Sequence, residues 1–317
     1  MIPNEQRHPE LTTLEAFEEG LREAFAAGGG TLLRPQPDLL HVLEPEGDTY
    51  ISAVPVPLAA RQQMDPKPVC MVTITALLKT RPRLTHEQVN TCNRYASLAL
   101  LSQQRGKQEV MAVNAFTIYD DPVQRTQALY VAQQAAVLQR TWLSQVLAGL
   151  EDDFRRSVAV LDPQSAHLSS RWTDTELKSM FAEILKADLR ARQPDPHGIV
   201  IHLSNTHVRG QGSFVIVRND VAHAFYGNGL SITLVLPEEP RTDREHLERR
   251  ALEWNRREVV SIMPTPCIGA WSSVLGKSQM QHQCFIPNVI YAPGIGYWLL
   301  EGTMQRWALS GEPGEPV

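Results

Sequence analysis

The same order of helix and strand signals occurs twice in the chain, at an offset of about 160 residues. Each half begins with a helical pattern, continues with short β-rich segments between Gly, Pro and Asn residues, and returns to a helix, strands and a final helix. The landmarks at this offset are Thr12 and Thr173, Thr85 and Thr242, Asn93 and Asn255, and Trp142 and Trp298. A repeated order at one offset predicts two copies of one module, and two unrelated domains remain the alternative.

The expected fold class is α+β, with two tandem modules that each run helix–antiparallel meander–helix–strands–helix. A chain of 317 residues is long enough for two domains of ordinary size. Residues 161–172 contain Pro, Ser and polar residues without a hydrophobic period, which is typical of a linker. The expected division is therefore a first module over 1–160, a linker over 161–172 and a second module over 173–317.

Capping-box spacing predicts where several helices begin, because a threonine hydroxyl and a glutamate or glutamine three residues later satisfy each other's backbone amides. The pairs are Thr12 and Glu15, Thr85 and Gln88, Thr173 and Glu176, and Thr242 and Glu245. A longer helix is expected from Pro122 to about Leu150. It has two neighbouring apolar faces, and the stripe of Val131, Leu138 and Trp142 is expected to pack module against module.

Charge and hydropathy exclude several classes of protein. The net charge is −5 and the basic residues form no single cluster, which argues against direct nucleic-acid binding. The N-terminus is polar, and no apolar run reaches the roughly 18–20 residues that a membrane span needs. We therefore expect a cytoplasmic protein without a membrane partner.

The cysteines and histidines suggest no strong catalytic or metal site. Cys70, Cys92, Cys267 and Cys284 are scattered without CxxC spacing, so neither a disulfide framework nor a zinc site is expected, and no cofactor is expected. His202, His207 and His223 are close in sequence but lack the spacing that would place all three on one strand face. His282 and Cys284 have spacing for one strand face, yet no third group is evident to activate the thiol. We expect no enzymatic activity.

One helix of each half carries a related asparagine motif. The first half has VNTCNRYA over Val89–Ala96, and the second has LEWNRRE over Leu252–Glu258. With the element order, these segments resemble the asparagine-bearing helix of the YbjN-like family, which shares its fold with type III secretion chaperones. Asn90 and Asn93 fit the doubled pattern, whereas only Asn255 fits in the second half.

The resemblance implies a non-enzymatic chaperone or adaptor that holds a segment of a client protein, such as a secreted substrate or a stress or DNA-repair protein. It also implies an intramolecular pseudo-dimer, with a homodimer of the whole chain as a further arrangement. Trp254 and Trp271 are the expected partner-binding residues, because Trp271 lies among small residues that suit a groove. The alternative is an enzyme or small-ligand protein with its site between the modules, around His202, His223, or His282 and Cys284.

Overall fold

The structure is a computed structural model, and it describes residues 9–27, 29–44, 47–56, 67–79, 83–95, 99–103, 109–151, 192–195, 198–203, 212–223, 227–238, 242–260, 268–274, 276–290 and 295–310. Several expectations lie outside these residues. They are the linker over 161–172, the helix start at Thr173 and Glu176, and the positions of His207 and Cys267.

The first half of the chain contains a four-stranded meander between two helices, followed by two further strands and the long helix. Its helices are α1 (Pro9–Ala27), α3 (His86–Arg94) and α4 (Pro122–Glu151). Its strands are β1 (Thr31–Gln36), β2 (Leu39–Glu44), β3 (Gly47–Pro55), β4 (Pro68–Lys79), β5 (Leu100–Gln103) and β6 (Glu109–Tyr119).

The second half repeats this order from its meander onwards. Its strands are β7 (Arg192–Asp195), β8 (Gly198–His202), β9 (Phe214–His223), β10 (Gly227–Pro237), β11 (Ala270–Ser273) and β12 (Gln279–Pro287). Its helices are α6 (Arg244–Val260), the short 3-10 helix η3 (Asn288–Ile290) and α7 (Ile295–Ser310).

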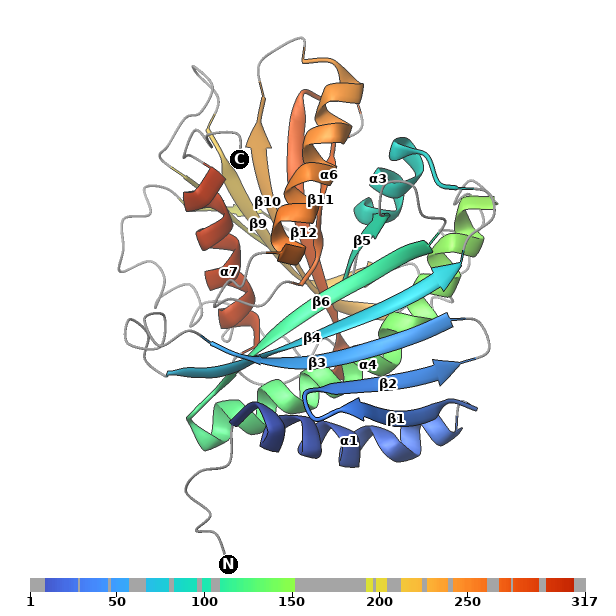
Figure 1. The fold of residues 1–317 in the computed structure, drawn as a ribbon. Helices are drawn as coiled ribbons and strands as arrows, with labels where there is room; N and C mark the ends of the chain where they lie inside the picture. Colours follow the sequence, from blue (N-terminus) through green and yellow to red (C-terminus); the bar gives the residue numbers. More distant parts are fainter. Residues whose placement is uncertain are drawn as a thin grey trace, which may run out of the picture.

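The strands form two six-stranded antiparallel sheets with the same internal order. The first sheet has the order β1-β2-β3-β4-β6-β5, and the second has β7-β8-β9-β10-β12-β11. In each sheet the last strand in the chain is therefore inserted beside the fourth, and the strand before it forms an edge. Figure 1 shows the two sheets with helices packed on them, and the prediction of an α+β fold is confirmed.

The helix starts follow the capping rules only in part. At α3 the predicted capping box is confirmed, because the Thr85 hydroxyl accepts from the Gln88 amide and the Gln88 side chain accepts from the Thr85 amide. The prediction at Thr12 is wrong, because α1 already begins at Pro9, a residue favoured in a first helical turn. At α6, which begins at Arg244, the carboxylate of Asp243 accepts from the Glu245 amide.

The inner face of the first sheet is covered by α1 and α4, which lie side by side (Figure 1). The apolar stripe of α1 is buried, and its members are Leu14, Phe17, Leu21 and Phe25. It meets inward side chains of the strands such as Ile51 and Ile74, which are also buried. Burial of this apolar area is the main term that stabilises the layer arrangement.

The two halves meet through α3, α6 and the edge strands β5 and β11. Helix α3 packs against β11 and α6, and α6 packs against β5. One asparagine in each helix binds the edge strand of its own sheet. Asn93 donates to the carbonyl of Leu101 over 3.1 Å and accepts from its amide over 2.8 Å. Asn255 makes the same pair of hydrogen bonds to Trp271, at 2.9 and 2.8 Å.

Two side chains of the first half, Asn90 and Arg94, form hydrogen bonds with the second half. Asn90 accepts from the amide of Ser273 and donates to its hydroxyl, and Arg94 donates to the carbonyl of Ser273. The edge of β11 is thus covered by side chains from both halves. The residue of α6 that corresponds to Asn90 is Leu252, which is buried among apolar side chains, so the interface is not symmetric in its chemistry.

Candidate binding groove

The second sheet has an inner face that packs on helices and an outer face of mixed polarity. Along β12, Met280, His282 and Cys284 are buried, while the intervening glutamines are half-buried. This alternation follows from the pleat of a strand, which sends successive side chains to opposite faces. The three outward residues are Gln279, Gln281 and Gln283.

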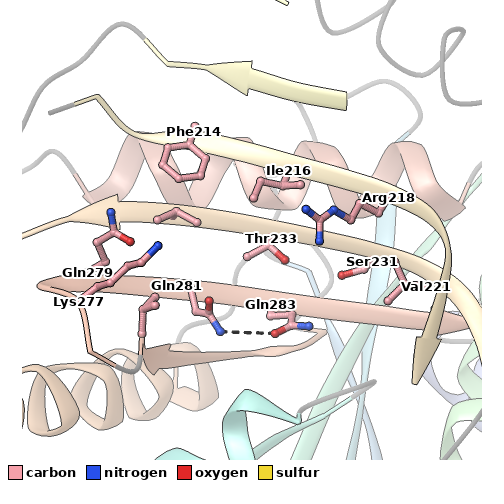
Figure 2. Close-up of a pocket in the computed structure, with 12 residues that line it drawn as sticks. Phe214, Ile216, Arg218, Val221, Ser231, Thr233, Lys277, Gln279, Gln281 and Gln283 are labelled. Atoms are coloured by element: carbon pink, nitrogen blue, oxygen red, sulfur yellow. Dashed lines mark hydrogen bonds between the residues drawn. The ribbon is translucent and has the colours of Figure 1, made fainter. Parts of the chain in front are cut away.

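A groove with a volume of about 330 Å³ lies on this outer face. Figure 2 shows its side chains on the near face of the sheet, with helices behind the strands. It is lined by Phe214, Ile216, Arg218, Val221, Ser231, Thr233, Val235, Val274, Lys277, Gln279, Gln281 and Gln283. The lining thus combines five apolar side chains, five neutral polar ones and two cations.

The register of the strands orders these side chains in rows across the sheet. Arg218 lies opposite Ser231, and Ile216 lies opposite Thr233, which in turn faces Gln283. The next row joins Phe214, Val235 and Gln281. The Gln281 amide donates to the side-chain oxygen of Gln283 over 3.5 Å, a long contact that leaves hydrogen-bonding capacity on both amides.

The corresponding face of the first sheet is closed where the groove would be. On β6 the outward residues Val113, Ala115 and Thr117 are buried. In the first sheet, Val113 of β6 lies opposite Thr75 of β4, and in the second sheet Gln283 of β12 lies opposite Thr233 of β10. Val113 and Gln283 therefore occupy corresponding places. The open polar groove is therefore a property of the second half.

His282 and Cys284 do share a strand face, as their spacing indicates, but this is the inner face. The side chain of His282 is fully buried, and neither ring nitrogen has a hydrogen-bond partner within the described residues. Burial lowers the pKa of His282 to about 3 and, in Cys284, raises the thiol pKa to about 12. A neutral thiol without access to solvent is a poor nucleophile.

A buried ion pair lies beside this histidine. Arg306 in α7 donates two hydrogen bonds to Glu258 in α6, at 2.8 and 2.9 Å, and both side chains are less than a tenth exposed. Burial on its own raises the pKa of the Glu258 carboxyl, but the charge of Arg306 and the hydrogen bonds from Arg306 and Trp271 outweigh it and lower that pKa to about 2. The group is a paired structural anion at neutral pH.

Trp271 and Trp254, which the sequence suggested for partner binding, lie together near this pair. Trp271 is 2% exposed, and its indole nitrogen donates to Glu258 over 2.6 Å. Trp254 is half-buried, packs edge-on against Trp271 with ring centres 4.3 Å apart, and has the Arg250 guanidinium over its ring. Neither tryptophan lines the groove on the outer face.

The residues expected to pack module against module lie on α4. Val131 is fully buried and Leu138 is partly buried in the main apolar core. Helix α4 packs chiefly on β6 and α1 of its own half, with a smaller contact to η3 of the second. The side chain of Trp142 lies outside the described residues.

The remaining described histidines are apart from one another. His202 is exposed at the end of β8, beside Phe214. His223 is nearly buried, stacks on Phe285 and contacts the carbonyl of Tyr95 in the first half over 3.3 Å. Burial lowers the pKa of His223 to about 4. Within the described ranges, no three His, Cys, Asp or Glu side chains are grouped so that they could hold a metal ion.

The groove residues were not singled out by motif analysis. A signal exists in QMQHQCF, where glutamine alternates with a residue that becomes buried. Glutamine at every second position of a strand marks a polar face. The face becomes a groove only because Phe214 and Ile216 of β9 stand beside it, which the sequence order alone does not reveal.

Comparison with known proteins identified no relative. No family model matches the chain, and neither a curated protein nor a solved structure is similar to it. Among the described helices, none is both long and apolar enough to cross a membrane.

Proposed function

We propose that the chain is a pseudo-dimer of two related modules that holds an extended segment of a client protein in the outer groove of the second sheet. The observation that carries this proposal is the groove itself, which runs along β9, β10 and β12 and combines apolar, amide and hydroxyl side chains. Apolar side chains supply affinity for a peptide, and amides match its backbone donors and acceptors.

Two features support the descent of both halves from one module. The strand order is the same in both sheets, including the insertion of the last strand beside the fourth. Asn93 and Asn255 also make the same two hydrogen bonds to the edge strand of their own sheet. These features agree with the resemblance to the YbjN-like family and to type III secretion chaperones, and we retain that assignment as part of the proposal.

The edges of both sheets are poorly suited to pairing with an added client strand, which favours binding on the face of the second sheet. The β11 edge is occupied by side chains of Asn255, Asn90 and Arg94, and Asn93 covers part of the β5 edge. The opposite edges, β1 and β7, each contain a proline, Pro35 or Pro194, which lacks the amide that a new strand would need. A client strand is therefore better received on the outer face.

The proposal is tested by site-specific photocrosslinking in the living host. A photoreactive phenylalanine derivative replaces Thr233 at the centre of the groove, and the same derivative replaces Thr75 as the matched control. Both threonines are half-buried on the middle strand of their sheets. We expect adducts at position 233 that map, by mass spectrometry, to one continuous segment of a protein.

The control decides how the adducts are interpreted. Position 75 should give none of the adducts found at position 233, because the neighbouring side chain there is the buried Val113. Equal adducts at the two positions, or none at position 233, would contradict binding in the groove. A small molecule recovered at position 233 would instead favour a ligand-binding protein.

A further inference from the structure

The groove has the opposite charge to the protein that contains it. The whole chain has a net charge of −5, yet the twelve lining residues include Arg218 and Lys277 and no aspartate or glutamate. The backbone amide of Glu238 donates to the Ser278 carbonyl in the turn beside Lys277, and the Glu238 carboxylate forms an ion pair with Arg250 at 2.6 Å. The lining therefore offers a negative ligand two side chains of opposite charge.

We propose that the groove selects an acidic client segment in which two carboxylate side chains lie about six residues apart, one contacting Arg218 and the other Lys277. This inference rests on the proposed peptide-binding function and adds the chemistry of the ligand to it.

The spacing follows from the register of the sheet. Arg218 lies opposite Ser231, and Gln279 lies opposite Pro237, six positions further along β10. At about 3.3 Å per residue, the two places are about 20 Å apart. Lys277 stands in the turn just before Gln279, and Figure 2 shows it at the opposite end of the groove from Arg218. An extended peptide covers this distance with about six residues, an even number that keeps both carboxylates on one side.

The middle of the groove suits a peptide backbone. Between the two cations lie the side chains of Thr233, Gln281 and Gln283, flanked by Phe214 and Ile216. An amide side chain offers a donor and an acceptor, as a peptide group does. The apolar flank receives the small or branched side chains that point to the same side of the segment as the carboxylates.

A nucleic acid fits this groove less well than a peptide. Non-sequence-specific binding of nucleic acid relies on several phosphate contacts and on aromatic rings that stack on bases. The groove has two cations and the single aromatic ring of Phe214. We therefore assign the acidic segment to a protein and make an oligonucleotide one arm of the test.

The test measures fluorescence anisotropy of labelled peptides with the full-length protein. The probe is a Thr- and Val-rich peptide of roughly twelve residues with two glutamates about six residues apart. Its isostere carries glutamines at the same places, and a third peptide has the glutamates about five residues apart, on opposite sides. A thymidine oligonucleotide of similar length serves as the phosphate-bearing arm.

We expect the acidic peptide to bind at least about fivefold more tightly than its isostere and than the shifted peptide, with the preference decreasing as salt rises. Lys277→Gln and Arg218→Gln should each reduce the preference by about threefold to fivefold. Arg22→Gln, which removes an exposed charge from α1, should leave it unchanged. Lys277→Glu should bind a peptide with lysine at one end better than wild type does, which loss of folding cannot produce.

Each outcome separates this inference from the proposed function. Equal binding of the acidic peptide and its isostere, or tighter binding of the oligonucleotide, overturns the assignment of an acidic segment. If crosslinks at Thr233 nevertheless map to one client segment, the proposed function stands. If position 233 captures no protein segment, both fall.

Discussion

The side chain of Asn90 in α3 is hydrogen-bonded to the backbone and hydroxyl of Ser273 in β11, in the other half of the chain. Asn90 accepts from the Ser273 amide over 3.0 Å and donates to its hydroxyl over 2.9 Å. Both residues are buried, so these contacts exclude water and replace the neighbouring strand that an edge lacks. The halves are thereby joined by directional contacts as well as by apolar packing.

Replacing Asn90 by leucine, the residue at the corresponding place in α6, should destabilise the protein by about 1–3 kcal/mol, because the Ser273 amide would be buried without a partner. Urea unfolding followed by circular dichroism measures this change. Glu87→Gln, which removes an exposed ion pair with Arg244 across the same interface, is the control and should cost less than about 1 kcal/mol. An equal effect of both variants would show that Asn90 has no special role.

The two equivalent asparagines should be equally sensitive to change. Asn93→Asp and Asn255→Asp each keep an acceptor for the edge amide but lose the donor to the edge carbonyl, of Leu101 or Trp271. A buried charge facing a carbonyl oxygen is unfavourable, so we expect losses of at least about 2 kcal/mol in both variants. Thermal unfolding provides the measurement. A large loss in only one variant would contradict equivalent roles.

Acid should destabilise the fold through its buried histidines. Burial places the folded-state pKa of His282 at about 3 and that of His223 at about 4, below the ordinary value of 6.5. The unfolded chain therefore takes up protons first, and stability decreases as pH falls below about 6.5, by about 1.4 kcal/mol per pH unit for each histidine.

This pH dependence is measured by urea unfolding at several pH values. His282→Leu should remove about half of the slope between pH 6.5 and about 4. At lower pH, protonation of Glu258 adds a further loss, because its folded pKa of about 2 lies below the ordinary value. If the dependence of stability on pH is the same in His282→Leu as in wild type, the imidazole of His282 is charged in the folded wild-type protein.

The described cysteines should be unreactive in the native state. Cys70, Cys92 and Cys284 are buried, and burial raises the pKa of Cys92 and Cys284 to about 12. Iodoacetamide at mildly alkaline pH should therefore alkylate these three only after unfolding, as peptide mass spectrometry would reveal. Labelling in urea supplies the positive control. Rapid alkylation of Cys284 in the folded protein would revive the possibility of nucleophilic chemistry at the His282 position.

Removing one partner of the buried Arg306–Glu258 ion pair should destabilise the fold more than replacing both partners by neutral residues. Arg306→Met removes the cation beside the buried Glu258 carboxylate and should cost about 3–5 kcal/mol. Adding Glu258→Gln in the same chain removes that anion and should restore part of the loss. The comparison of the single and double variants by chemical unfolding isolates the coupling. A double variant less stable than Arg306→Met would argue against it.

Local sequence determined the elements of this protein and their order. Period and capping residues located α3 and α4, because a helix end needs its orphan amides satisfied by residues close in sequence. The asparagine motif marked the two helices that bind the sheet edges. The alternating glutamines of β12 fixed which side chains would share a face.

Tertiary structure decided what those faces became. Trp271 lies among small residues in the sequence, yet it is buried, and its indole donates to Glu258 of α6, which is in turn paired with Arg306 of α7. The glutamine face became a groove because β9 lies beyond β10 and brings Phe214 and Ile216 alongside. Periodicity along one strand specifies which residues share a face, whereas the neighbours that cover or frame that face come from segments far away in the chain, so only the folded arrangement determines whether the face is core or binding surface.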